Sequence, residues 1–242
     1  EYLYSVVPSE MPTEYQKEAL KAQAVCARSY AIKQMAGKRL AALGAHVDDS
    51  VAFQVYNNLR EDAASIAAVN ETKGQVVFAE NQVAETYFYS VSAGVSAGIK
   101  EVWFAKKDRS YLMPCVLLGD SRKTLDLQKE ADFSKFLKDE TKSYDANSPW
   151  YRWRTTVSEK QLQQFISEKI KSRYEKNPTQ IQTKQKDGTF FSTGQTELGE
   201  IKKVEILKRG KSGVAVMAQI TGSKNTLRIY TEYNLRNLFG GE

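Results

Sequence analysis

The chain has 242 residues, of which 41% are hydrophobic and 26% charged, as in an ordinary globular protein of one domain or two small ones. Since no run of about 18 apolar residues occurs, these residues hold no membrane-spanning helix. The formal net charge of +6 favours anionic partners. The lysines and arginines are scattered and form no dense blocks, which disfavours a nucleic-acid-binding function.

The chain opens on Glu1 rather than methionine, and its first residues have the pattern of a structural element already under way. We therefore expect that any signal peptide or membrane anchor belongs to a segment that precedes Glu1. The two cysteines, Cys26 and Cys115, have no cysteine or histidine nearby at the spacing of zinc ligands, so we expect no zinc site. We interpret Cys26 as a small buried residue of an alanine-rich helix.

The first unusual feature in chain order is Glu10, which lies between Pro8 and Pro12 with Ser9 and Met11 as its immediate neighbours. The two prolines predict a rigid, mostly apolar bend ahead of a long helix. A glutamate that only solvates a surface more often lies in a charged run, so Glu10 is a candidate functional residue. The alternative is that Glu10 stabilises the positive end of the following helix dipole.

After this bend the sequence predicts a helix that runs to about Gly37. Thr13 and Gln16 form a capping-box pattern at its start, and its many alanines predict close packing against another element. One side carries three basic residues at helical spacing, a pattern typical of a solvated face: Lys17, Lys21 and Arg28.

The next segments predict a loop, two short strands and a helix. Residues 46–56 predict a loop that leads into a short strand, and residues 60–74 predict a helix that Gly74 ends. Residues 75–79 and 83–90 predict a hairpin of two strands joined by Glu80, Asn81 and Gln82. The second strand continues into a loop of small and hydroxyl-bearing residues, a common place for ligand contacts.

The rest of the chain predicts further helices and a series of strands. Ser158 and Gln161 form a capping box that opens a helix ending near Tyr174. The other predicted elements are a short helix over 131–139, a strand over 148–157, strands with glycine turns over 199–230, and a closing helix over 231–239.

This mixed order predicts an α+β fold of helices and short antiparallel strands with a strand-rich C-terminal third, not alternating βαβ units. We expect one domain over residues 1–242, in which residues 150–242 could form a strand-rich subdomain.

Several of these stretches resemble, in the same order, motifs of one bacterial family. They are EYLYSVVPSEMP from residue 1, EALKAQAVCARSYA, DDSVAFQVY, YFYSVSAG before EVW, SPWYRW, and the terminal TEYNLRNLFG. The chain resembles the SpoIID/LytB family, named for stage II sporulation protein D and the amidase enhancer LytB. The resemblance covers essentially the whole chain, and the first motif is the most specific.

This resemblance implies a cell-wall protein of the cell envelope that acts outside the cytoplasmic membrane. Sporulation members are lytic transglycosylases, which cut glycan strands whose stem peptides an amidase has already removed. The glutamate of their SEMP motif, here Glu10, is the catalytic acid, and the arginine of the following helix is here Arg28. The implied partners are peptidoglycan glycan strands and a cell-wall amidase.

The chain departs from the family pattern in two places. Relatives often carry a histidine before the hydroxyl-rich loop, where this chain has Tyr89 followed by residues 90–94. Some relatives also carry cysteine and histidine residues able to hold zinc, whereas the corresponding stretches of this chain offer only His46. Metal binding is therefore not carried over, and we expect no metal and no other cofactor.

The residues around Glu10 suit the chemistry that the resemblance implies. A lytic transglycosylase needs one carboxyl group, whereas an ordinary glycosidase needs two. That carboxyl must hold its proton near neutral pH, which apolar surroundings favour because they disfavour the charged form. Val6, Val7 and Met11 supply such surroundings, and no lysine or arginine lies within five residues of Glu10.

Other residues are predicted to contact the substrate. Because a straight helix from Thr13 to Arg28 rises about 22 Å, Arg28 should not touch Glu10 and is either a substrate or a scaffold residue. The loop from Ser90 to Gly94 should form one wall of the cleft close to Glu10, the alternative being a surface turn whose serines face water. The predicted substrate-binding residues are Arg28, Gln54, Tyr56, Tyr89, Ser90, Ser92, Gly94, Tyr151 and Arg152.

The sequence supports three hypotheses about function. The first is a peptidoglycan lytic transglycosylase with Glu10 as acid and base, whose stem-free substrate exposes lactyl carboxylates that Arg28, Arg152 and Arg154 could pair with. The second is a non-catalytic module that recruits or stimulates an amidase, in which Tyr151 and Arg152 could equally be ordinary strand residues. The third, a nucleic-acid binder, rests only on charge and has no supporting motif.

Overall fold

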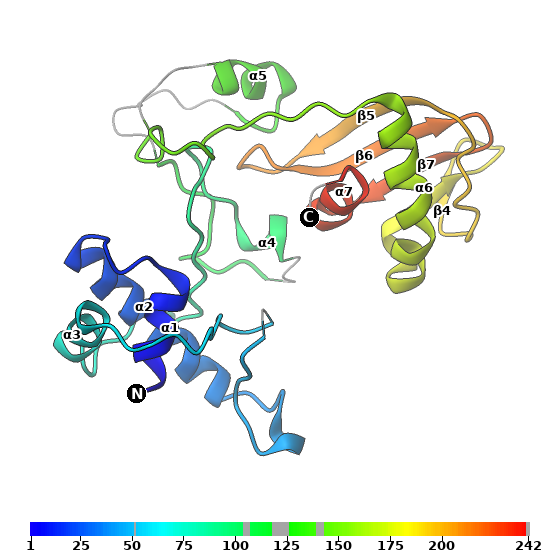
Figure 1. The fold of residues 1–242 in the computed structure, drawn as a ribbon. Coiled ribbons are helices and arrows are strands. Elements are labelled where there is room, and N and C mark those ends of the chain that lie inside the picture. The colour runs from blue at the N-terminus through cyan, green and yellow to red at the C-terminus, as the bar shows by residue number, and fades with distance from the viewer. Residues whose placement is uncertain (51, 104–106, 118–125, 139–142, 241–242) are drawn as a thin grey trace. The chain divides into compact units, whose positions relative to one another are not determined.

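The computed structural model describes residues 1–50, 52–103, 107–117, 126–138 and 143–240. The chain forms two compact units, residues 1–90 and residues 91–242, and each has its own elements (Figure 1). The described residues contain seven α-helices and two antiparallel sheets, so the predicted α+β class is confirmed. The predicted single domain over 1–242 stays a prediction, because compactness does not decide whether two units act as one.

The first unit is mainly helical. Its elements are α1 (Tyr2–Glu10), α2 (Lys17–Met35), a 3-10 turn (Ala41–Leu43), α3 (Ala63–Glu71), β1 (Phe78–Ala79) and β2 (Gln82–Val83). Its core joins the three helices through Val7, Leu20, Ala24, Ala68 and Val69. Ala24 and Ala68 are completely buried, so the prediction that the alanines allow close packing is confirmed.

The bend predicted at the start of the chain is wrong, because residues 2–10 form helix α1 with Pro8 inside its last turn. Proline removes one helical hydrogen bond, but Val6 and Val7 are fully buried, and their packing outweighs that loss. Glu10 therefore ends helix α1 and lies seven residues before α2, too far along the chain for the dipole of α2, whose effect fades within one turn. The alternative that Glu10 stabilises the start of a helix dipole is wrong for the same reason.

Helix α2 begins at Lys17, four residues later than predicted. The capping box of Thr13 and Gln16 does not form, since Gln16 makes no side-chain capping bond. The chain instead turns after Pro12, whose carbonyl accepts a hydrogen bond from the amide of Tyr15. Helix α3 lies within the predicted span and is capped at its start by Asp62, whose carboxylate accepts from the amides of residues 64 and 65.

The predicted hairpin is confirmed, although its strands are only two residues long. Glu80 and Asn81 both have left-handed backbone angles, which the two-residue turn between twisted strands requires. Beyond Val83 the strand does not continue, and the hydroxyl of Thr86 donates to the carbonyl of Cys26 in α2. Within the described part of residues 46–56, no strand forms either.

The second unit contains the larger sheet. Its elements are α4 (Ile99–Val102), α5 (Glu130–Lys138), α6 (Glu159–Lys176), a 3-10 turn (Pro178–Gln180), β3 (Ile181–Lys184), β4 (Phe190–Phe191), β5 (Ile201–Arg209), β6 (Ala215–Gly222), β7 (Thr226–Tyr230) and α7 (Glu232–Leu238). The strand order is β4-β3-β7-β6-β5, and each neighbouring pair is antiparallel. The predicted strand-rich C-terminal part is thereby confirmed.

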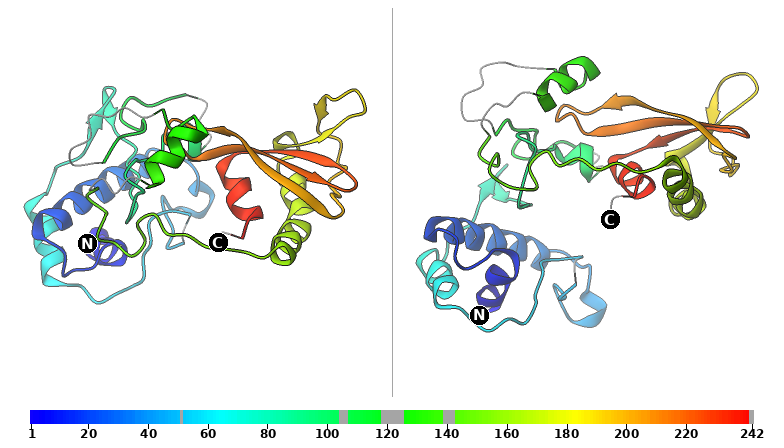
Figure 2. Two further views of the ribbon diagram at one scale, coloured as in Figure 1. Left: turned by 90° about the horizontal axis from the view of Figure 1, so that it is seen from above. Right: turned by 45° about the horizontal axis from the view of Figure 1, so that its top comes forward.

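Helices α6 and α7 lie on the same face of this sheet (Figure 2). Ile166 of α6 and Leu238 of α7 pack with Ile220, Leu227 and Ile229 of the central strands, and all five side chains are at most 1% exposed. The predicted capping box of α6 is confirmed, since Ser158 and Gln161 cap each other reciprocally. The predicted closing helix and the short helix near residue 131 are also confirmed, although residues 139–142 lie outside the described part.

The strand predicted over residues 148–157 is wrong, because the chain turns there. Pro149 follows Ser148, whose carbonyl accepts from the amide of Tyr151, and proline favours the second position of such turns. Arg152 then takes a left-handed backbone angle, with φ of 49°. In the described ranges, no helix combines the length and the apolar character needed to cross a membrane.

Candidate functional site

The candidate site is built around the last turn of α1. Glu10 is half-buried there, and its Oε1 accepts a hydrogen bond of 2.7 Å from the amide of Val55. One residue earlier, the hydroxyl of Ser9 accepts from the amide of Asn57 at 3.0 Å and donates to the carbonyl of Ser5. Alternate amides of an extended segment thus bond to side chains of α1. This explains why the predicted strand near residue 56 has no strand partner.

This docking places two further predicted residues beside α1. Gln54 is only 2% exposed, and the hydroxyl of Tyr2 donates to its Oε1 over a long 3.4 Å. The ring of Tyr56 stacks on that of Tyr2, with centroids 5.9 Å apart and planes 9° apart. The structure therefore brings Glu10, Gln54 and Tyr56 together around α1. Their roles in binding or catalysis stay predictions.

Tyr2 is a site residue that the sequence motifs did not single out. Burial raises its pKa to about 12, and the nearby Tyr30, Glu10 and Tyr56 add to this effect. Burial also raises the pKa of Tyr30, against the opposing effect of Arg39. Both phenols consequently keep their protons at neutral pH and remain hydrogen-bond donors. The helical spacing of Tyr2 and Ser9 could have indicated that both lie on the face of α1 that carries the site. That argument requires a helix at residues 2–10, which the sequence did not predict.

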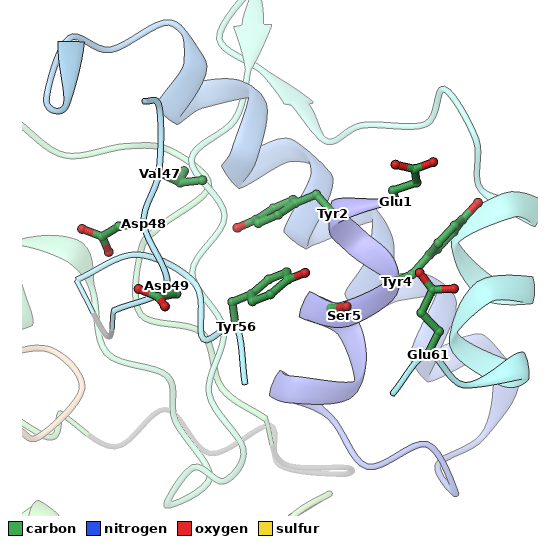
Figure 3. Close-up of a pocket in the computed structure, with 9 residues that line it drawn as sticks. All are labelled: Glu1, Tyr2, Tyr4, Ser5, Val47, Asp48, Asp49, Tyr56 and Glu61. Atoms are coloured by element: carbon green, nitrogen blue, oxygen red, sulfur yellow. The ribbon is translucent and has the colours of Figure 1, made fainter. Parts of the chain in front are cut away.

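An open cavity of about 710 Å³ adjoins this group (Figure 3). Its lining residues come from α1, the loop around residue 48 and the chain ahead of α3: Glu1, Tyr2, Tyr4, Ser5, Val47, Asp48, Asp49, Tyr56 and Glu61. Tyr2 and Tyr56 belong both to this lining and to the surroundings of Glu10, whereas Glu10 itself is not a lining residue. The lining combines aromatic faces with carboxylates and includes no lysine or arginine.

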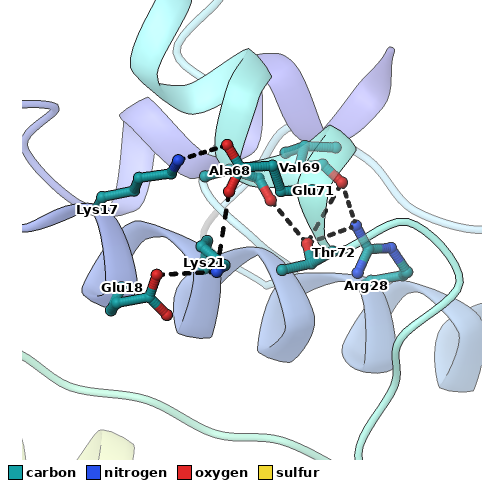
Figure 4. A network of polar contacts seen from close by, with 8 residues as sticks. All are labelled: Lys17, Glu18, Lys21, Arg28, Ala68, Val69, Glu71 and Thr72. Carbon is teal, nitrogen blue, oxygen red and sulfur yellow. Dashed lines mark hydrogen bonds and ion pairs between the residues drawn. The ribbon is translucent and has the colours of Figure 1, made fainter.

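Arg28 makes the contacts of a scaffold residue (Figure 4). Its Nη2 donates to the carbonyl of Val69 at 3.0 Å and to the hydroxyl of Thr72 at 3.2 Å, and its Nη1 donates to the carbonyl of Gln75. Burial lowers the pKa of its guanidinium. These bonds satisfy carbonyls at the end of α3 and tie that end to α2. Of the two interpretations left open for Arg28, they favour the scaffold role.

The predicted solvated face holds for Lys17, which is exposed, and needs correction for Lys21 and Arg28, which are half-buried. Lys17 pairs with Glu71 at 2.5 Å, and Lys21 lies between Glu71 at 3.8 Å and Glu18 at 2.8 Å (Figure 4). The pairing with Lys17 holds the pKa of Glu71 below its usual range. The helical spacing of these residues is as predicted, but spacing alone does not reveal a partner helix.

The hydroxyl-rich loop spans the division between the two units. Tyr89 and Ser90 end the first unit and are exposed, whereas Ser92 in the second unit is 8% exposed. The amide and hydroxyl of Ser92 both donate to the carboxylate of Asp145, at 3.0 and 2.5 Å. Gly94 is also buried, with φ of 99°. The alternative that both serines face water is therefore wrong for Ser92. That the loop walls a cleft at Glu10 stays a prediction.

Tyr151 and Arg152 are half-buried members of the turn region in the second unit. The Nε of Arg152 donates to the carbonyl of Ala93 at 3.1 Å, and its guanidinium lies over the rings of Phe136 and Tyr151. Neither residue belongs to a strand, so that alternative is wrong. Their predicted place in a sugar groove stays a prediction.

Metal ligands do not gather in the described part of the chain, where no group of three or more histidine, cysteine, aspartate or glutamate side chains could hold an ion. His46, the one residue left at the family's metal-binding stretches, is exposed. The expectation of a metal-free protein stays a prediction.

Comparisons with known proteins divide the chain at nearly the same place as its two compact units do. Residues 1–78 match the SpoIID family model, described as stage II sporulation protein, and residues 97–188 match a domain of unknown function, DUF8618. The amidase enhancer of Bacillus subtilis (strain 168) is 35% identical over 113 residues, which cover 44% of this chain and 15% of that protein.

Two stage II sporulation proteins D show similar likeness. The protein of Bacillus amyloliquefaciens is 35% identical and that of Bacillus subtilis (strain 168) 34% identical, each over 117 residues that cover 43% of this chain and 34% of the relative. The chain thus spans at most about a third of the length of these relatives. The resemblance drawn from the motifs is confirmed for the N-terminal part of the chain.

Proposed function

We propose that this chain, whose N-terminal part is related to stage II sporulation protein D and the amidase enhancer, is a peptidoglycan lytic transglycosylase of the cell envelope. It would cut glycan strands that lack stem peptides, outside the cytoplasmic membrane. The observation that carries this proposal is the setting of Glu10. One of its oxygens is fixed by the amide of Val55, and the stacked rings of Tyr2 and Tyr56 stand beside it.

The reaction needs one carboxyl group that gives and then regains a proton. The neutral carboxyl of Glu10 protonates the glycosidic oxygen as the bond to the C1 carbon of muramic acid breaks. The carboxylate then takes the proton of the C6 hydroxyl of the same sugar, whose oxygen bonds to C1. The product ends in a 1,6-anhydro ring, and no water is consumed.

The residues around Glu10 have distinct parts in this scheme. The amide of Val55 orients the carboxyl and stabilises its charged form while the proton is on the leaving sugar. Because its pKa is about 12, Tyr2 stays a hydrogen-bond donor and does not compete as a base. Tyr56 and Tyr2 offer ring faces to a sugar in the adjoining cavity.

Product analysis tests this proposal. Stem-free glycan would be incubated with the wild-type chain, with Glu10→Gln and with Glu14→Gln, an exposed glutamate four residues away that serves as the matched control. We expect 1,6-anhydro-muramic ends from the wild type and from Glu14→Gln, and none from Glu10→Gln. Ordinary reducing ends would instead mean hydrolysis, for which a second carboxylate such as Asp49 of the adjoining cavity would have to act.

A second candidate function has support from the name of one relative, the amidase enhancer, which is 35% identical to part of this chain. In this case the chain would bind peptidoglycan and stimulate an N-acetylmuramoyl-L-alanine amidase without cutting glycan. The test is the release of stem peptides from intact peptidoglycan by such an amidase. Stimulation that survives Glu10→Gln, together with no glycan cleavage by the wild type, would favour this function.

A further inference from the structure

One surface of the second unit is unusually aromatic. The aromatic segment, defined as residues 143–154, exposes Tyr144 by 82%, Trp150 by 70% and Trp153 by 63%. Tryptophan is highly buried on average, so two exposed tryptophans three residues apart call for an explanation. Exposed groups of large aromatic side chains commonly mark binding surfaces.

This segment is held in place by hydrogen bonds of its own turns. Ser148 accepts from the amide of Tyr151 through its carbonyl, at 3.0 Å, and from the amide of Trp150 through its hydroxyl, at 3.2 Å. Upstream, the carboxylate of Asp145 holds the amide and hydroxyl of Ser92. The backbone that carries the tryptophans is therefore ordered before any ligand arrives, which lowers the entropy cost of binding.

Arg152 fixes the backbone between the two tryptophans. Its φ of 49° lies in the left-handed region, which a residue other than glycine adopts only where its surroundings demand it. Those surroundings are the carbonyl of Ala93, to which its Nε donates, and the ring of Phe136, 4.3 Å from its guanidinium carbon. Arg152 thus supports the surface, and Trp150 and Trp153 are the side chains left open to solvent.

The composition and charge of the region indicate which ligand it takes. Residues 143–154 contain no valine, isoleucine, leucine, methionine or phenylalanine, so the segment lacks the side chains that insertion into lipid would use beside tryptophan. Residues 91–242 hold 27 lysines and arginines against 18 aspartates and glutamates, a net charge of +9. Arg154, next to Trp153, is exposed. Aromatic faces with a nearby cation in a basic unit suit an anionic polysaccharide.

We propose that the aromatic segment binds a peptide-free glycan strand at a site outside the unit that holds Glu10. Sugar rings stack on Trp150 and Trp153, and the lactyl carboxylates of the strand are drawn to Arg154. Because the two tryptophans are three residues apart, their α-carbons lie within about 11 Å, which lets neighbouring sugars of one strand meet both rings. That the ligand is a peptide-free glycan rests on the proposed function. That Trp150 and Trp153 form a binding surface does not depend on it.

Binding would be measured on full-length Glu10→Gln protein, so that the strand is not cut during the experiment. Peptide-free glycan fragments are titrated into this variant and into versions that also carry Trp150→Ala or Trp153→Ala. We expect each tryptophan change to weaken binding about tenfold, as for central aromatic residues of other interfaces. Phe191→Ala is the matched control, an exposed aromatic side chain on β4 of the same unit, and it should leave affinity unchanged.

Three further ligands show whether binding depends on the sugar rings, on negative charge alone or on a lipid surface. Neutral chitin oligomers should bind more weakly than the anionic glycan, and added salt should narrow that difference. Polyglycerol phosphate and anionic lipid vesicles should show no binding that depends on Trp150 and Trp153. Tryptophan-dependent binding of either would overturn the proposal, as would equal affinity of the alanine variants and the parent for glycan.

These outcomes can be told apart from failure of the proposed function. If the wild type leaves glycan uncut while Trp150→Ala and Trp153→Ala weaken glycan binding, the surface stands and the transglycosylase proposal fails. If glycan is cut with anhydro ends while both variants bind it like the parent, the transglycosylase proposal stands and the proposed binding surface fails.

Discussion

The two units of this chain differ most in charge. Residues 1–90 hold 8 lysines and arginines against 11 aspartates and glutamates, a net charge of −3, whereas residues 91–242 carry +9. The basic balance that favours an anionic partner therefore belongs to the second unit alone. The candidate site around Glu10 lies in the acidic one. A whole-chain net charge hides this division, and arguments about partners are better made unit by unit.

The units also differ in what holds them together. The first packs three helices through small residues, and its loops are fixed by side chains that bond to backbone groups, as Glu10 does with Val55. The second packs two helices on a sheet through large aliphatic residues. Each uses a partly or fully buried arginine to join its elements, Arg28 in the first unit and Arg173 in the second. The units thus differ in the size of the side chains that form their cores, and both rely on individual polar contacts to join their elements.

The largest expected effect is that of Glu10→Gln, which tests whether the first unit carries the catalytic residue. Glu10→Gln should lower the rate of glycan cleavage by about 100-fold or more, since an amide cannot cycle a proton. It should leave the fold intact, because the amide oxygen of glutamine can still accept from Val55. Rates come from the anhydro ends counted by mass spectrometry. Wild-type activity in Glu10→Gln would rule out the proposed mechanism.

The second prediction concerns the stability of the second unit. Asn234 is fully buried, its Oδ1 accepts from Nε and Nη2 of Arg173 at 2.9 and 2.8 Å, and its Nδ2 donates to Gln180 and to the carbonyl of Tyr230. Asn234→Ala leaves these groups without their partner, so we expect a loss of about 3 kcal/mol in the free energy of unfolding.

Hydrogen exchange would show where this loss falls. Protection should drop in β3, β7 and α7 and stay unchanged in α1–α3. Asn237→Ala in the same helix should change this protection little, because the side chain of Asn237 makes an exposed bond to the carbonyl of Tyr233 within that helix. Equal loss of protection in both units would mean that they unfold together, and the difference between the units would not extend to stability.

What could be predicted from the sequence was local. The capping box of Ser158 and Gln161 lies within four residues and forms as expected, and so does the hairpin turn at Glu80 and Asn81. Some failures are also local, such as the capping box of Thr13 and Gln16, but the failure at residues 2–10 depends on partners distant in sequence. Pro8 stays helical because Val7 is buried between helices, and no rule of nearest neighbours contains that packing.

The candidate site divides in the same way. Glu10 is identifiable from its motif, and Gln54 and Tyr56 are identifiable from a second motif, because each motif is a short continuous stretch. Tyr2 lies within the first motif, but the motif does not reveal its role, because its stacking on Tyr56 depends on a segment over 45 residues further along the chain. The exposure of Trp150 and Trp153 could not be predicted from their motif either, because the alternating pattern of residues 148–157 predicts a strand, whereas Pro149 starts a turn.

The third prediction separates the two interpretations of Arg28. Arg28→Gln should lower the free energy of unfolding of the first unit by about 1–2 kcal/mol, because the carbonyls of Val69 and Gln75 lose their donor. Chemical denaturation measures this loss, and Lys33→Ala, which removes a surface bond to Gln82, should cost less than about 0.5 kcal/mol. Unchanged stability together with a raised KM for glycan would instead assign Arg28 to the substrate.

The smallest effect is expected from Tyr2 at alkaline pH. Burial raises the pKa of Tyr2 from 10.0 in the unfolded chain to about 12 in the folded one. Between these values the folded state binds more protons than the unfolded state, so stability is complete below pH 10 and falls as the pH rises toward 12. The loss should be on the order of 1 kcal/mol, since the ring is only half-buried and solvent screens part of the effect.

Urea unfolding at about pH 9 and about pH 11.5, on either side of the ordinary tyrosine pKa, would measure this loss. Tyr2→Phe has no proton to lose and should show a smaller decline over the same range, because the unfolded state of this variant gains nothing from ionisation at residue 2. An identical decline in both proteins would place the alkaline sensitivity elsewhere in the molecule. Tyr2 would then not be the half-buried, protonated donor beside Glu10 that the proposed mechanism requires.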